Sequence, residues 1–174
     1  MHIQTRGLMI GFVVGFAACA GAQDVGRGTF KMPDGKDVGT VTVTRAGANL
    51  NFALKLNGLS PGTHAIHIHA VGKCDPPDFA SAGPHLNPAN KKHGSKNPEG
   101  PHAGDLPNLE ISKDGKLDTT ISASGVAPSG NGGLLDGDGA SLVIHAGPDD
   151  YATDPSGNSG GRIACAVIDL PQKQ

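Results

Sequence analysis

Apolar and polar residues alternate along much of this chain, and glycine or proline separates the alternating segments. Residues 41–44 alternate between valine and threonine, and residues 50, 52, 54 and 56 are all leucine or phenylalanine. A period of two predicts β-strands, because successive side chains of a strand point to opposite faces. About eight short strands are predicted in this way, the others at residues 28–32, 65–70, 106–111, 117–122, 141–145 and 162–170.

The chain has 27 glycines and 13 prolines, and none of its segments has a convincing helical period. Asp114-Gly115, between two predicted strands, is typical of a hairpin turn. Many short strands with such turns predict an all-β sandwich or barrel. Two irregular stretches, residues 71–101 and 146–161, are too long for simple turns. Long ordered loops on a compact β domain usually carry function.

The first 22 residues have the pattern of a signal peptide that is cleaved on export. Arg6 lies in a short positive region, residues 7–18 are largely apolar, and Ala20-Gly21-Ala22 is a small-residue cleavage site. Cys19 allows a second interpretation, because residues 16–19 resemble a lipoprotein cleavage box. Lipidation of Cys19, which would anchor the protein to a membrane, and plain cleavage before Gln23 both predict export. Residues 23–174 are then one domain.

Charge and cysteine content narrow the class of protein. After residue 22 the chain has 13 basic and 16 acidic residues, a formal charge of −3, and lacks a basic patch. Nucleic acid is therefore not an expected partner. Two cysteines remain, Cys74 and Cys165, and in an oxidising compartment such a pair indicates one structural disulfide.

Histidines are the candidate functional residues of this chain. His67 and His69 are two positions apart on a predicted strand, so they share one face, and Ile66 and Ile68 share the other. An exposed polar strand face would give the same pattern, so the pair alone is only moderately specific. His64 falls on the opposite face from His67, which indicates a structural role.

The first long loop adds three histidines and a carboxylate, and one more histidine ends the strand at residues 141–145. Three histidines with a carboxylate make a closed tetrahedral shell of the kind that zinc takes. Neutral imidazole suits both zinc and copper. The pattern therefore predicts a two-metal site, whose candidate ligands are His67, His69, His85, His93, His102, Asp105 and His145.

The motifs HIH, SAGPHLNP, KKHG, GPHAGDLPN, VIH and GNSGGRIAC resemble those of the copper–zinc superoxide dismutases, most of all the exported bacterial branch. The resemblance covers essentially all of the chain after residue 22. Each motif is short, but their joint order and spacing are very specific. The resemblance implies an eight-stranded Greek-key barrel related to the immunoglobulin-like sandwich, for which this enzyme family is a named example.

The resemblance also implies a role for each candidate residue. One copper per chain would be bound by His67, His69, His85 and His145. One zinc per chain would be bound by His85, His93, His102 and Asp105. His85 would be shared as a bridging imidazolate and would carry a proton during catalysis. Arg162 would guide the anion to copper, Asp149 would link a copper histidine to a zinc histidine, and Cys74 would pair with Cys165.

The activity that the resemblance implies is the disproportionation of superoxide to dioxygen and hydrogen peroxide. The alternative is an exported, periplasmic copper or zinc buffer with the same ligands, which would not need Arg162. Between His145 and Arg162 the chain has no lysine or arginine. Lys91, Lys92 and Lys96 on the first loop are candidates to steer the anion, although a solvated loop face is the simpler explanation. Both a monomer and a homodimer are compatible with the sequence.

Overall fold

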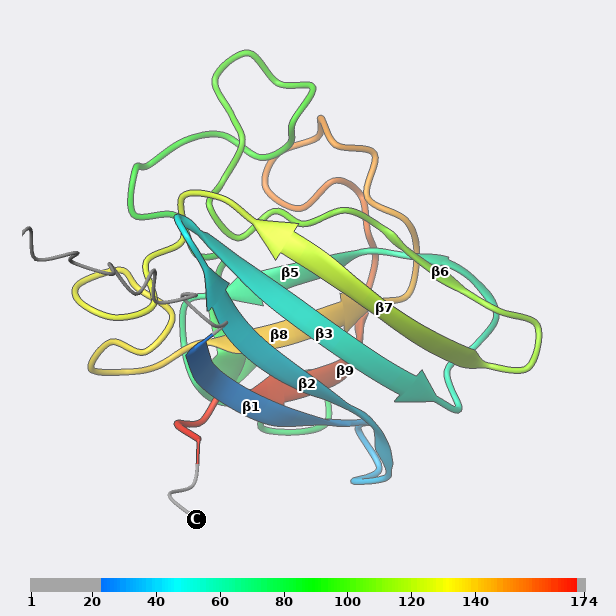
Figure 1. Cartoon of the computed structure of the whole chain (residues 1–174). Coiled ribbons are helices and arrows are strands. Elements are labelled where there is room, and N and C mark those ends of the chain that lie inside the picture. Colours follow the sequence, from blue (N-terminus) through cyan, green and yellow to red (C-terminus); the bar gives the residue numbers. More distant parts are fainter. Residues whose placement is uncertain (1–22, 172–174) are drawn as a thin grey trace, which may run out of the picture.

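The computed structural model describes residues 23–171, whose regular secondary structure is almost entirely antiparallel β-strand (Figure 1). One short 3₁₀ helix, η1 (Ala80–Ala82), lies in the first long loop, which in the structure spans residues 70–108 between β5 and β6. The strands are β1 (Gln23–Lys31), β2 (Asp37–Ala46), β3 (Asn49–Asn57), β4 (Gly62–His64), β5 (Ile66–His69), β6 (Leu109–Ile111), β7 (Lys116–Ala123), β8 (Ser141–His145) and β9 (Arg162–Val167). In the described residues, no helix is long and apolar enough to cross a membrane.

Seven of these strands form one curled sheet in the order β5-β8-β9-β1-β2-β3-β7. Strands β4 and β6 form a second, two-stranded sheet. The order places β8 beside β5, although β6 and β7 lie between them in the chain, and it places β9 beside β1, so the connections cross from one part of the sheet to another. The expected all-β Greek-key class is confirmed, and Figure 1 shows β1, β2, β3 and β7 in front of β5, β8 and β9.

Several predicted bounds differ from the structure. The predicted strand at 65–70 is shortened to β5 at Ile66–His69, and Ala65 separates it from β4, because the Ala65 backbone accepts from His145 and donates to Gly147. The turn at Asp114-Gly115 forms, but the strands on either side are not partners, because β6 pairs with β4 and β7 pairs with β3. The turn therefore links two sheets and does not close a hairpin.

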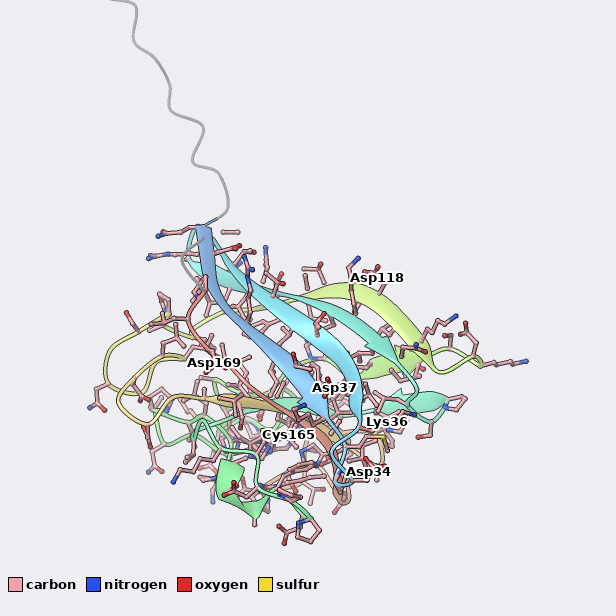
Figure 2. All side chains as sticks on the ribbon, turned by 90° about the horizontal axis from the view of Figure 1, so that it is seen from below. Asp34, Lys36, Asp37, Asp118, Cys165 and Asp169 are labelled. Atoms are coloured by element: carbon pink, nitrogen blue, oxygen red, sulfur yellow. A yellow bond between two sulfur atoms is a disulfide. The ribbon has the colours of Figure 1, made fainter. Side chains whose placement is uncertain are left out.

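The alternating apolar residues of both halves of the large sheet meet in one core, with Phe30, Phe52, Leu54, Ile68 and Ile144 among its fully buried members. Burial of this size accounts for most of the favourable free energy of folding. Charged residues lie outside the core, as around the β1–β2 turn, where Figure 2 shows Asp34, Lys36 and Asp37 close together.

Candidate metal centre

Strands β5 and β8 bring three histidines to one place. The two strands are antiparallel neighbours in which His67 pairs with Val143 and Ile66 pairs with Ile144. Ile66 and Ile68 point into the core and are fully buried. His67 and His69 consequently face the other side, as the alternation predicted. Both are nevertheless buried, because the long loops cover this face of the sheet.

The first group of potential ligands consists of imidazoles whose ligand atoms lie within 4.8 Å of one another: His67, His69, His85 and His145. Three of them donate one ring N–H to a fixed acceptor. Nε2 of His67 donates to Asp149 Oδ2 at 2.8 Å, and Nδ1 of His69 donates to the Gly83 carbonyl at 2.8 Å. Nδ1 of His145 donates to the Gly160 carbonyl at 3.2 Å. These bonds set the ring orientation and leave the other nitrogen as a lone pair.

The remaining nitrogens of this group have no hydrogen-bond partner although they are buried. They are His67 Nδ1, His69 Nε2, His85 Nε2 and His145 Nε2. A buried polar atom without a partner costs about 1–3 kcal/mol, so four in one place require an explanation. Four convergent imidazole lone pairs are a donor set that suits copper.

The second group surrounds Asp105. Asp105 Oδ1 lies 3.0 Å from Nδ1 of His85, 3.0 Å from Nδ1 of His93 and 3.2 Å from Nδ1 of His102. Nδ1 of His102 lies 3.4 Å from Nδ1 of His85. Ligand atoms at zinc-ligand bond lengths of about 2.0–2.1 Å in a tetrahedron are separated by about 3.3 Å. The observed spacings fit that geometry and donor set.

His67 also lies near the second group, but neither of its two ring nitrogens is available to that group. Its Nε2 binds Asp149, and its Nδ1 is one of the unpartnered atoms of the first group. Asp149 in turn accepts from Nε2 of His93 through Oδ1 at 2.9 Å. The fully buried Asp149 carboxylate therefore joins a histidine of one group to a histidine of the other.

Burial and hydrogen bonding move the pKa values of these groups in opposite directions. Burial lowers the pKa of His69 to about 2 and that of His85 and His145 to about 4. His93 is also buried, but its bonds to Asp105 and Asp149 raise its pKa to about 9. At neutral pH the metal-free first group is therefore neutral, which is the form that binds a metal.

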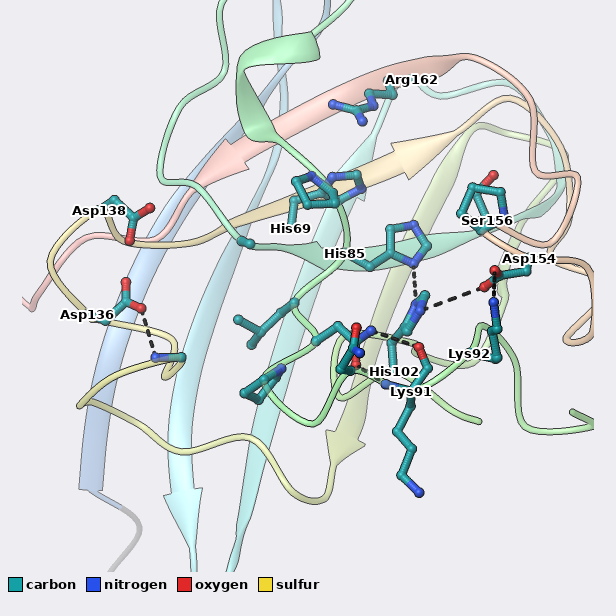
Figure 3. A pocket seen from close by; sticks show the side chains of 18 of the residues that line it. His69, His85, Lys91, Lys92, His102, Asp136, Asp138, Asp154, Ser156 and Arg162 are labelled. Carbon is teal, nitrogen blue, oxygen red and sulfur yellow. Dashed lines mark hydrogen bonds and ion pairs between the residues drawn. The ribbon is translucent and has the colours of Figure 1, made fainter. Parts of the chain in front are cut away.

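Arg162 begins β9 and lies at the end of a cavity of about 910 Å³ that the histidines line. Nη1 of Arg162 donates to the Phe79 carbonyl at 2.6 Å, and Nη2 donates to the Gly83 carbonyl at 2.9 Å. The Gly83 carbonyl thus holds both Arg162 and His69. Figure 3 shows Arg162 near His69, and Asp136 and Asp138 at a separate side of the cavity.

The disulfide Cys74–Cys165 joins the first long loop to β9, with a Cα–Cα distance of 5.7 Å. The sequence prediction of this pair is confirmed. Cys165 and the buried Phe79 belong to a small apolar cluster beside the main core. Phe79 also has a left-handed backbone, with φ of 55°. The disulfide and Phe79 thereby fix the loop segment whose carbonyls hold Arg162.

His64 is buried, and both of its ring nitrogens are occupied, Nδ1 by the His145 carbonyl at 2.8 Å and Nε2 by the Ser60 carbonyl at 3.0 Å. It is a structural residue, as the sequence indicated.

A third irregular segment, residues 124–140, supplies Asp136 and Asp138 to the cavity, although the sequence analysis did not single it out. Its glycine content resembled ordinary turns, so no pattern in the sequence identified it.

Comparison with known proteins agrees with this geometry. A family profile described as copper/zinc superoxide dismutase (SODC) matches residues 38–168. A Cu-Zn superoxide dismutase of Caulobacter vibrioides is 48% identical over 142 residues, which cover 79% of this chain and 82% of the relative. A Cu-Zn superoxide dismutase of Aquifex aeolicus is 44% identical over 137 residues, which cover 77% of this chain and 81% of the relative.

Solved structures extend the likeness to the fold. A double mutant of a superoxide dismutase-like protein from Bacillus subtilis has a TM-score of 0.79 and 43% identity, covering 83% of this chain and 97% of that one. The Cu/Zn superoxide dismutase of Brucella abortus has a TM-score of 0.65 and 32% identity, covering 82% of this chain and 98% of that one.

The chain is therefore a metal-dependent oxidoreductase built on a Greek-key β fold. It belongs to the copper/zinc superoxide dismutase family, with copper and zinc as cofactors and superoxide as substrate. Its disulfide is of the kind that persists in oxidising compartments, which agrees with an exported protein.

Proposed function

We propose a division of the seven ligands between two metals and a role for each neighbouring residue. The first group, His67, His69, His85 and His145, binds copper. The second group, His85, His93, His102 and Asp105, binds zinc. Copper supplies the redox chemistry, because it can cycle between two oxidation states, whereas zinc shapes the site.

His85 carries this proposal because its two ring nitrogens belong to different groups. Its Nδ1 lies 3.0 Å from Asp105 Oδ1, among the ligands assigned to zinc. Its Nε2 is buried and unpartnered, among the ligands assigned to copper. A single imidazole ring with one nitrogen in each group supports a bridging imidazolate. Nε2 of His85 would then be the atom that takes up a proton beside the substrate and donates it to the oxygen that is reduced.

Arg162 and Asp149 complete the proposed site. The Arg162 guanidinium is held beside His69 by two carbonyls and is a fixed positive charge that attracts a small anion. Asp149 orients His67 and His93 at once and keeps both rings in the tautomer that leaves Nδ1 free. Neither role requires the residue to bind a metal.

The assignment is tested by a pair of variants that each serve one metal. His145→Ala should lose copper and return superoxide decay to the uncatalysed rate while it retains zinc. His102→Ala should weaken zinc binding while copper still binds. Copper and zinc content are measured by mass spectrometry, and superoxide decay by pulse radiolysis. The assignment fails if His145→Ala retains both copper and full activity.

The same assay separates the enzyme from a metal buffer. A buffer with these ligands would bind both metals but would leave superoxide decay at the uncatalysed rate. The presence of Arg162 beside the copper ligands favours the enzyme, because metal storage has no use for an anion-binding cation at that place.

We also propose that residues 1–22 direct export to the bacterial periplasm and are removed, leaving the domain at residues 23–174. This leader lies outside the described residues. Intact mass of the exported protein distinguishes cleavage before Gln23 from lipidation of Cys19, which would add an acyl-chain mass and anchor the protein to a membrane. Light scattering of the same sample distinguishes a monomer from a homodimer.

A further inference from the structure

Tyr151 is the only tyrosine of the chain, which also has no tryptophan. It lies two residues after Asp149 on the second long loop and has a left-handed backbone, with φ of 64°. A residue with a Cβ seldom adopts this conformation unless its surroundings hold it there. The contacts of Tyr151 therefore hold it in this conformation.

The contacts of Tyr151 run to Asp149 and to two separate points of the first long loop. Its N–H donates to Asp149 Oδ1 at 2.6 Å. Its carbonyl accepts from the Lys96 N–H at 2.9 Å, and its hydroxyl accepts from the Asn108 N–H at 2.9 Å. The Lys96 ammonium also lies over the ring, 5.3 Å from its centre.

Asn108 completes the connection on the other side of Asp149. Its Oδ1 accepts from the Asp149 N–H at 2.9 Å, and its Nδ2 donates to the Asp149 carbonyl at 3.0 Å. Asn108 thus holds the backbone of Asp149, while Tyr151 holds its carboxylate. Lys96 and Asn108 lie on the stretch of the first loop that also carries His102 and Asp105.

We propose that Tyr151 is a positioning residue that couples the two metal sites. It links the first loop, which carries ligands assigned to zinc, to the Asp149 carboxylate, and through Asp149 to His67 among the ligands assigned to copper. The inference rests on the proposed ligand assignment. It predicts that zinc raises copper affinity, and that part of this coupling passes through the Tyr151 hydroxyl and its bond to Asn108.

The single tyrosine allows a direct spectroscopic test. Zinc is added to the metal-free full-length domain while tyrosine emission is recorded. We expect the emission to change with zinc and to reach its end point at one equivalent, because the Lys96 and Asn108 contacts of Tyr151 lie on the loop that bound zinc would hold. Emission that does not respond to one equivalent of zinc would overturn the proposal.

A variant then tests the coupling itself. Tyr151→Phe keeps the ring but removes the acceptor of the Asn108 N–H. Copper affinity is measured with and without bound zinc, and the ratio of the two is the coupling factor. We expect Tyr151→Phe to reduce this factor by about tenfold, the lower end of what loss of an outer partner costs a metal site. The copper spectrum of the zinc-loaded variant should also shift toward that of the zinc-free wild type.

Phe52→Leu is the control for a mere loss of stability, because Phe52 is fully buried in the core and lies on β3. It should lower stability and leave the coupling factor unchanged. An unchanged coupling factor in Tyr151→Phe, or an equal fall in Phe52→Leu, refutes the proposal. Failure of the ligand assignment would look different, because His145→Ala would then retain copper.

Discussion

Replacement of Arg162 by alanine tests how the protein attracts its substrate. The guanidinium is half-buried, held by the Phe79 and Gly83 carbonyls, and lies in the cavity that His69, His85 and His145 line. Superoxide is a monoanion, and the chain after residue 22 carries a formal charge of −3. The net charge of the protein therefore opposes the approach of substrate, and a local cation has to overcome it.

The size of the effect follows from Coulomb's law. Two unit charges at 4 Å interact by about 1 kcal/mol in water and about 4 kcal/mol near a protein surface of lower dielectric. For a half-exposed group, about 1–2 kcal/mol is reasonable, and about 1.4 kcal/mol is tenfold in rate. Arg162→Ala should therefore lower the rate per copper by about 5–30-fold while both metals stay bound. Arg162→Lys should recover part of the rate, because it restores the charge but not the planar fork.

Pulse radiolysis across a salt series measures this effect. The wild-type rate should fall with salt, because screening at 0.1 M acts over about 10 Å, and the Arg162→Ala rate should depend on salt less. Arg45→Ala is a matched control, since it removes the same charge from an exposed position at the end of β2. Equal rates and salt slopes for wild type and both Arg162 variants would show that Arg162 does not guide the substrate.

Three further predictions concern the disulfide, Gly157 and the protonation of His93. Cys74→Ser opens the bond to Cys165 across 91 residues and should lower the free energy of unfolding by about 4–5 kcal/mol in denaturant titrations; an unchanged midpoint would contradict this. Gly157→Ala drives a Cβ into Asp149 Oδ1 at a φ of 64°, so copper affinity should fall by about 10–100-fold; retained affinity in a copper titration would disprove it. The pKa of His93, raised to about 9, means that the folded metal-free protein holds an extra proton between the ordinary value of 6.5 and 9. The stability from this proton is complete below pH 6.5 and is lost as pH rises through 9. Zinc should accordingly displace about one proton at pH 7.5, measured by calorimetry in two buffers; zero release would refute it.

The strands and the shared face of His67 and His69 were predictable because they repeat a local pattern. Alternation put His67 and His69 opposite the core residue Ile68, and the structure has them so. The pairing of β4 with β6 was not predictable, since a strand of three residues has no period to detect. The same limit explains why Asp114-Gly115 predicts a hairpin that the structure does not contain. Turn residues specify a reversal of the chain and not the partner of each strand.

The groups that position Arg162 were hidden from the sequence for a different reason. They are the carbonyls of Phe79 and Gly83, and a backbone carbonyl is present at every residue, so no residue type marks it. In the sequence, Tyr151 differs from its neighbours only as the single tyrosine. Gly157 cannot be told from the many other glycines. Their importance depends on contacts between loops more than 40 residues apart in the chain, such as that from Asn108 to Tyr151.

The metal centre departs from the rule that buried polar atoms find partners. Four ring nitrogens of the first group are buried and unpartnered, and they are those of His67, His69, His85 and His145. At about 1–3 kcal/mol each, they would be a large burden for a protein of ordinary stability. The burden is tolerable because burial also lowers the pKa of most of these rings and keeps them neutral, so no buried charge is added. The rings cannot relax toward other partners, because carbonyls and the Asp149 and Asp105 carboxylates hold their opposite nitrogens. The fold thus directs these lone pairs toward one point, and bound metals would stabilise the protein by satisfying them.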